Sequence, residues 1–182
     1  MQFHNTTFRD TWLVQLEPIH DTRGFFVRTF CVDEFGARGL ETNFPQHSAS
    51  YSGRKGTLRG MHYQCPPHSE VKLVRCVKGA IWDIIVDIRP DSPTFRCWEG
   101  FELSESNHRQ LYIPRGFAHG FQTLSEGVEV NYLISERYVA EAARGIRHDD
   151  PSFAIQWPLP VSEISAKDLR WPDFSASSTS RS

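Results

Sequence analysis

The stretch Val71-Lys72-Leu73-Val74-Arg75-Cys76-Val77-Lys78-Gly79-Ala80-Ile81-Trp82-Asp83-Ile84-Ile85-Val86-Asp87-Ile88 carries the strongest fold signal in this chain. Two runs rich in β-branched residues flank Lys78-Gly79, which is a typical turn pair. The second run stops at the breaker cluster Arg89-Pro90-Asp91-Ser92-Pro93. We therefore predict two strands over residues 71–88, joined as a hairpin.

Similar short runs continue on both sides of this stretch. The run Val128–Ile134 alternates cleanly, so Tyr132 should point inward together with Val128, Val130 and Ile134. Residues Val32–Gly39 predict one short helix. Many short strands with regular turns and little helix favour an all-β fold, an antiparallel jelly-roll barrel with a few short peripheral helices. We expect one domain over residues 1–174 and a disordered Ser-rich tail over 175–182.

Composition narrows the class of protein. The 182 residues are 39% hydrophobic and include 13 Phe, which suits a globular core filled by rings. The net charge of −2 predicts no nucleic-acid partner, and no apolar run is long enough to predict a membrane span. The four cysteines form no Cys-x-x-Cys pair, and the first ten residues do not resemble a signal peptide. We expect reduced thiols and a cytoplasmic protein.

Two segments concentrate side chains suited to proton chemistry. Thr57–Gln64 contains Arg59 and His62, and Ile113–Phe121 contains His119. With Lys72 and Tyr132, these residues lie on segments expected to face the barrel interior. Charged groups are rarely buried without a partner or a purpose, so the interior should bind an anion beside an acid/base group. The alternative is that His62 and His119 are structural histidines held by hydrogen bonds.

The spacing Pro114-x-Gly116-x-x-His119 resembles the second signature of the cupin jelly-roll superfamily. Metal-binding cupins add a His-x-His pair and a Glu, but here the first segment reads His62-Tyr63-Gln64. A metal site needs three or four convergent ligands, so we predict that no metal is bound.

Two further fragments have simple structural readings. Asp21–Phe26 could be only a hairpin turn with a solvated Arg23, and Ser165-x-Lys167-Asp168 could be an exposed turn or a helix cap.

Taken together, the motifs resemble the dTDP-4-dehydrorhamnose 3,5-epimerase family, the nucleotide-sugar epimerase branch of the cupins. The resemblance covers about Trp12 to Pro172 and rests on many blocks in order: Asp21–Phe26, Thr57–Gln64, Lys72–Val74, Val86–Arg89, Ser92–Thr94, Ile113–Phe121, Gly145-Ile146 with Asp149–Pro151, Ile155-x-Trp157-Pro158 and Ser165-x-Lys167-Asp168.

The resemblance implies an epimerase of a nucleoside-diphosphate 4-keto-6-deoxyhexose for deoxysugar biosynthesis, working through an enolate without a metal or other cofactor. By the same resemblance His62 is the base, Asp168 supports its imidazole, Tyr132 is the acid and Lys72 stabilises the oxyanion. It also implies a homodimer whose N-terminal strands lend residues to the neighbouring site. The substrate-binding residues that it implies are Arg23, Phe26, Arg28, Gln46, Arg59, His119 and Tyr138.

Several positions depart from the usual family pattern. Arg28 stands where Glu is usual, and Phe44-Pro45-Gln46 stands where Gln-x-Asn usually precedes the His-Ser segment. A typical Glu before the Gly-Ile pair is replaced in Ala143-Arg144-Gly145-Ile146, and His148 replaces a frequent Trp. The nucleotide, the sugar and the choice between C3, C5 or both therefore stay open. The alternatives are a mono-epimerase using another nucleotide, a metal-dependent cupin dioxygenase or isomerase, and a non-catalytic sugar-binding cupin.

Overall fold

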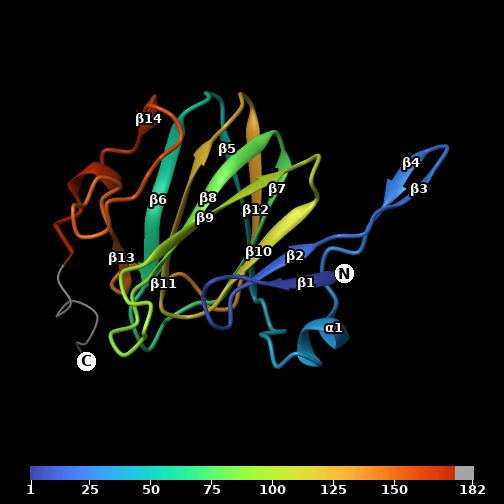
Figure 1. The fold of residues 1–182 in the computed structure, drawn as a ribbon, viewed down its shortest axis with the longest axis horizontal. Coiled ribbons are helices and arrows are strands. Elements are labelled where there is room, and N and C mark those ends of the chain that lie inside the picture. Colours follow the sequence, from blue (N-terminus) through green and yellow to red (C-terminus); the bar gives the residue numbers. More distant parts are fainter. Residues whose placement is uncertain (175–182) are drawn as a thin grey trace.

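The computed structural model describes residues 1–174, and the predicted disordered tail lies outside the described residues. Two antiparallel sheets face each other (Figure 1). The first has the strand order β1 (Gln2–Asn5), β2 (Trp12–Gln15), β10 (Arg109–Ile113), β7 (Lys72–Lys78), β12 (Val128–Ile134) and β5 (Gln46–Ser52). The second has the order β13 (Ala143–Gly145), β6 (Thr57–Gln64), β11 (Phe117–Thr123), β8 (Ala80–Asp87) and β9 (Trp98–Ser104).

The predicted all-β jelly roll is therefore confirmed, with one local exception to its antiparallel pattern. β14 (Glu163–Ile164) pairs in parallel with β6. The helical elements of the described chain are α1 (Val32–Gly36), within the predicted helix range, and the single 3-10 turn η1 (Asp168–Arg170). Neither is long or apolar enough to cross a membrane. The single-domain boundary and the cytoplasmic location stay predictions.

The predicted hairpin over residues 71–88 is wrong. Both strands form, but β7 pairs with β10 and β12 in the first sheet, whereas β8 pairs with β9 and β11 in the second. Gly79, at φ +76, turns the chain from one sheet to the other. Each of the two strands has hydrogen-bonded partners on both sides within its own sheet, which leaves no free edge for pairing with the other. Turn residues such as Lys78-Gly79 show where a strand ends but not which strand it pairs with.

The central core lies between the two sheets and follows the alternation of their strands. Val74, Leu111 and Val130 enter it from the first sheet, and Ile85 and Phe121 enter it from the second. All four cysteines are free, as expected from their spacing.

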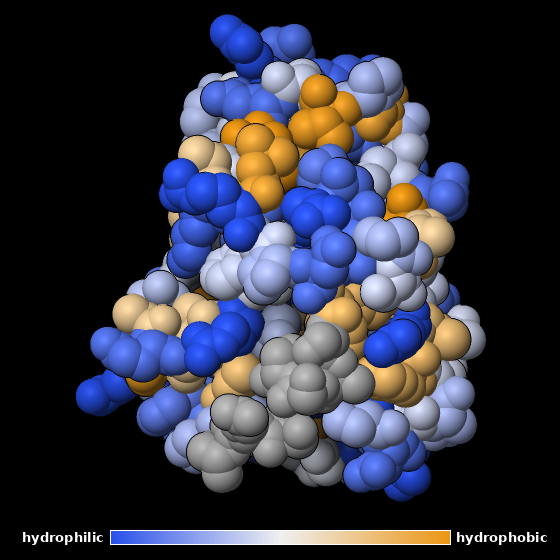
Figure 2. Space-filling model, turned by 90° about the vertical axis from the view of Figure 1, so that its left-hand side faces the viewer, coloured by the Kyte–Doolittle hydropathy of each residue, from blue (hydrophilic) through white to orange (hydrophobic). Residues whose placement is uncertain are grey.

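Other core clusters cover the outer faces of the sheets. One packs α1 and nearby rings against the first sheet. Another packs the segment after β13 against the second sheet. The C-terminal segment, coloured orange to red in Figure 1, lies beside β6, on the side away from the β3–β4 hairpin (Ile19–Asp21 and Gly24–Phe26). The space-filling view of the C-terminal side shows hydrophobic side chains gathered near its top among hydrophilic ones (Figure 2).

Candidate active site

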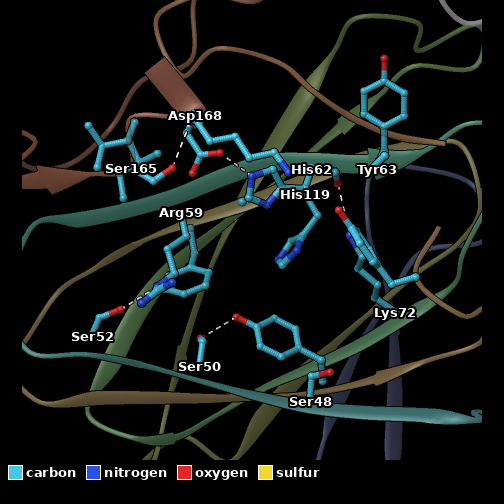
Figure 3. Close-up of a pocket in the computed structure, with 18 of the residues that line it drawn as sticks. Ser48, Ser50, Ser52, Arg59, His62, Tyr63, Lys72, His119, Ser165 and Asp168 are labelled. Carbon is cyan, nitrogen blue, oxygen red and sulfur yellow. Dashed lines mark hydrogen bonds and ion pairs between the residues drawn. The ribbon is translucent and has the colours of Figure 1, made fainter. Parts of the chain in front are cut away.

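A cavity of about 640 Å³ opens between the two sheets. His62, Lys72, His119 and Tyr132 all line it, as the sequence predicted. Tyr132 comes from β12 of the first sheet, whereas His62 comes from β6 of the second, so the two side chains belong to facing walls. Figure 3 shows the arrangement of the labelled residues.

An irregularity in β6 brings Arg59 and His62 to the same wall. His62 lies opposite His119 and Arg59 lies opposite Phe121, so β6 carries one more residue than β11 across this interval. Residues three apart on a regular strand face opposite sides, and a bulge of this kind restores the same side. Gly60 has φ +127, and a Cβ there would collide with the backbone of Gly120, so only glycine allows this close approach.

His62 forms a short pair with Asp168. Nε2 of His62 lies 2.6 Å from Oδ1 of Asp168, although the residues are 106 positions apart. The Asp168 side chain is 5% exposed and that of His62 is 44% exposed. Burial alone would raise the pKa of the Asp168 carboxyl, but the hydrogen bond and charge of His62 outweigh it and hold the pKa below its ordinary value. An ionised carboxylate here fixes the proton on Nε2 and leaves Nδ1 of the imidazole as the acceptor.

The C-terminal segment holds Asp168 in place through several contacts. The Ser165 hydroxyl accepts a hydrogen bond from the Asp168 N–H at 3.0 Å. The Trp171 ring lies so close to Gly145 that a Cβ at Gly145 would collide with it, and Gly145 is paired with His62 across the sheet. The position of the carboxylate therefore depends on this packing as well as on η1.

Lys72 is held between two acceptors. Its Nζ donates to the His62 carbonyl oxygen at 3.2 Å and lies 2.9 Å from Oε1 of Glu70. The other Glu70 oxygen accepts from Nε2 of Gln64 at 2.8 Å. The ammonium group is thus oriented beside the His62 backbone, where it can stabilise negative charge on a bound molecule.

Tyr132 and His119 lie next to each other in the cavity. The Tyr132 hydroxyl lies 2.9 Å from the Ser50 hydroxyl. Burial raises the pKa of Tyr132 well above its ordinary value, so the phenol is protonated at neutral pH. Nε2 of His119 lies 2.5 Å from Oδ1 of the fully buried Asp83, and the rings of His119 and Tyr132 are 6.4 Å apart between centroids.

Three other predicted binding residues also line the cavity: Arg59, Gln46 and Tyr138. The Arg59 guanidinium donates to the Ser52 hydroxyl and to the Tyr51 carbonyl oxygen. The Gln46 side chain accepts from the Tyr138 backbone N–H at 3.1 Å, and the Tyr138 side chain is 58% exposed. The cavity wall thus carries the guanidinium donors of Arg59, the side-chain amide of Gln46 and the exposed ring of Tyr138.

Arg23, Phe26 and Arg28 do not line the cavity of their own chain. Arg23 and Phe26 lie on the β3–β4 hairpin, which projects from the body on the side away from the C-terminal segment (Figure 1). Arg23 is exposed and pairs with Asp21, Phe26 is 72% exposed, and Arg28 lies near Glu34. Within a single chain, Asp21–Phe26 therefore forms the hairpin turn with an exposed Arg23 that was one of the two interpretations of this segment.

Sequence reasoning missed some of the side chains in and behind the cavity wall. Ser50, Glu70, Lys167 and Trp171 line it, and Asp83 stands behind His119. Two signals could have found them. Ser48, Ser50 and Ser52 alternate along one strand, and Asp83 is a charged residue inside the otherwise apolar run Ala80–Val86.

Among residues 1–174, no group of three or more His, Cys, Asp or Glu side chains is arranged to hold a metal ion. His62 and His119 each have an aspartate on Nε2. Metal independence stays a prediction.

Comparisons with known proteins agree with this geometry. A family model described as dTDP-4-dehydrorhamnose 3,5-epimerase matches residues 5–176. The Shigella flexneri dTDP-4-dehydrorhamnose 3,5-epimerase is 42% identical over 175 residues, which are 96% of each chain. A dTDP-4-dehydrorhamnose 3-epimerase from Streptomyces niveus is 37% identical over 158 residues, covering 86% of this chain and 76% of the relative.

A solved structure gives the same result. The crystal structure of dTDP-4-dehydrorhamnose 3,5-epimerase from Bacillus anthracis, with TDP and PPi bound, is 40% identical. It superposes with a TM-score of 0.92 over 95% of this chain and 99% of that one. With the family model spanning nearly the whole chain, this protein belongs to the dTDP-4-dehydrorhamnose 3,5-epimerase family.

Proposed function

We propose that this protein epimerises a dTDP-linked 4-keto-6-deoxyhexose in deoxysugar biosynthesis, inverting C3, C5 or both. The observation that carries the proposal is the placement of the His62–Asp168 pair and of Tyr132 on facing walls of one cavity. Inversion at carbon requires a base on one face of the sugar ring and an acid on the other. Family membership supports the substrate class.

The reaction begins with proton abstraction. The 4-keto group acidifies the neighbouring C–H bonds, and Nδ1 of His62 accepts the proton from C3 or C5. Asp168 stabilises the resulting imidazolium through Nε2–H. The electrons of the broken C–H bond move into the enolate, and the ammonium group of Lys72 stabilises its oxygen.

Reprotonation completes the inversion. The Tyr132 hydroxyl donates its proton to the same carbon from the opposite face, and the enolate electrons form the new C–H bond. Arg59 and His119 hold the diphosphate and sugar, with guanidinium donors suited to phosphate oxygens. Gln46 and Tyr138 lie at the cavity wall, where the nucleoside would lie.

We propose that the active form is a homodimer. The β3–β4 hairpin exposes Ile19, Phe25 and Phe26, and an exposed apolar projection of this kind is typical of an interface. In the dimer, the hairpin and the segment after it would bring Arg23, Phe26 and Arg28 to the partner's cavity. This arrangement would explain why these residues lie outside their own cavity.

Deuterium wash-in tests the reaction directly. The protein would be incubated in heavy water with a dTDP-linked 4-keto-6-deoxyhexose and with its UDP-linked counterpart, and C3 and C5 would be followed by NMR. We expect exchange with inversion for the dTDP sugar and none with His62→Ala. The 3-epimerase relative makes inversion at C3 alone the second candidate. Absence of exchange at both carbons would refute the proposal.

Subunit mixing tests the dimer. A chain carrying Arg23→Ala and Phe26→Ala would be mixed with a His62→Ala chain, after separate assays show each to be inactive. If the hairpin crosses the interface, one site of each mixed dimer is intact, and the activity should recover to about a quarter of wild type after random reassortment. A monomer at micromolar concentration, or no recovery despite demonstrated mixing, would contradict the arrangement.

A further inference from the structure

The phenol of Tyr132 has one hydrogen-bond partner among the described residues, the hydroxyl of Ser50 at 2.9 Å. Ser50 lies on β5, the edge strand of the first sheet, next to β12. Its side chain alternates inward with those of Ser48 and Ser52, and all three line the cavity (Figure 3). The register places Ser48 opposite Tyr132 and Ser50 opposite Val130, so the Tyr132 side chain reaches Ser50 diagonally.

The surroundings of Tyr132 make its ionised form unfavourable. The ring packs against the central core, and burial is the main reason why its pKa is raised. The charge of Asp83 raises this pKa further, whereas the Ser50 hydroxyl and the charge of Arg59 lower it. Arg59 itself is engaged by Ser52 and the Tyr51 carbonyl. Any phenolate formed here therefore depends on Ser50 as its immediate donor.

We propose that Ser50 is a positioning residue for proton donation by Tyr132. Its hydroxyl donates to the Tyr132 oxygen, which turns the phenol O–H toward the bound sugar and stabilises the phenolate left after proton transfer. The inference rests on the proposed function, because it assigns Tyr132 the role of acid.

The hydrogen bond between Ser50 and Tyr132 matters in the step in which Tyr132 gives up its proton. The Tyr132 O–H bond breaks as the new C–H bond forms, and the negative charge moves from the enolate to the phenolate. The phenolate then takes a proton from water, while the His62 imidazolium releases the proton that it removed from the sugar. Ser50 keeps its own proton throughout and acts only through its hydrogen bond. Its effect should therefore fall on inversion and not on the first proton abstraction.

The test uses Ser50→Ala, with deuterium exchange and inversion measured separately. Inversion should slow by about 10–100-fold, the range for losing a hydrogen bond to a charged group. Exchange that returns hydrogen to the original face should change little, because it needs His62 alone. Ser50→Thr keeps a hydroxyl and should restore inversion. Ser106→Ala is the matched control, since it removes a hydroxyl–hydroxyl bond of 3.0 Å, with Ser104, outside the cavity.

A second readout does not need turnover. The near-ultraviolet absorption band of Tyr132 at neutral pH, obtained by subtracting the spectrum of the Tyr132→Phe variant, should shift in Ser50→Ala, because the band of a buried phenol depends on its hydrogen bonds. An unchanged band would overturn the contact even if the epimerase reaction itself failed to occur.

Three kinetic outcomes would overturn the role. Equal loss of exchange and inversion would mean that Ser50 supports the whole site. A higher KM with unchanged kcat would mean that Ser50 binds substrate. Unchanged inversion would mean that another group stabilises the phenolate.

Discussion

Replacing Asp168 with asparagine should slow proton abstraction while leaving the fold intact. The carboxylate lies 2.6 Å from Nε2 of His62 and is almost fully buried, so the variant removes a charge without removing volume. If the asparagine NH₂ group faces Nε2, the imidazole proton must move to Nδ1, and the nitrogen facing the substrate can no longer accept a proton. If the amide oxygen faces Nε2, the tautomer survives but the imidazolium loses its counter-charge.

The structure sets the size of the effect. Two unit charges about 4 Å apart interact by about 4 kcal/mol at an effective dielectric constant of about 20. The His62 side chain is 44% exposed. Solvent screening therefore reduces this to about 2 kcal/mol, or about 30-fold in rate. We therefore expect a decrease of about 30-fold if the tautomer survives, and of about 10²–10³-fold if it changes.

The assay is deuterium wash-in at C3 and C5, followed by NMR. Asp10→Asn is the matched control, because Asp10 is an exposed carboxylate paired with Arg9 at 3.6 Å, and asparagine tolerates its positive φ. Circular dichroism and thermal melting would confirm that both variants fold. Wild-type exchange in the folded Asp168→Asn variant would refute the assignment and reduce Asp168 to a structural residue of η1.

Three other predictions address the acid, the C-terminal segment and pH. Tyr132→Phe should retain most deuterium exchange and lose most inverted product on NMR, and inversion at the wild-type rate would place the acid elsewhere. Gly145→Ala should displace Trp171 and lower the melting temperature, since overpacking costs about 1–3 kcal/mol. Deuterium exchange should also slow, because the shift of Trp171 disturbs Asp168; an unchanged exchange rate would mean that the position of Asp168 does not depend on Trp171. Burial raises the pKa of Asp87, but Arg89, Ser92 and Thr94 outweigh it and lower the folded-state pKa. Stability from Asp87 is therefore present above its unfolded pKa of about 3.9 and is lost as pH falls below that value. The free energy of unfolding, measured with denaturant, should therefore fall less on acidification in Asp87→Asn than in wild type.

Local periodicity was enough to predict the strands within residues 71–88 and 128–134 and the inward direction of Tyr132. A strand alternates its faces at every residue, so Val128–Ile134 identified the face of Tyr132 without knowledge of its partners. The helix over Val32–Gly36 followed from local composition in the same way. The jelly-roll class followed from the many short strands and the scarcity of helix, because most parallel pairing needs long crossover connections that are usually helical.

Long-range packing decided the rest. Alternation tells which face a residue occupies but not which strand lies beside it, and so the 71–88 pair was assigned to one hairpin when its strands belong to two sheets. The bulge at Gly60, which aligns Arg59 with His62, depends on the close approach of Gly120. The contact between His62 and Asp168 joins residues 106 positions apart. The partners of these residues are selected by burial and sheet pairing over the whole chain, and no local pattern encodes that selection.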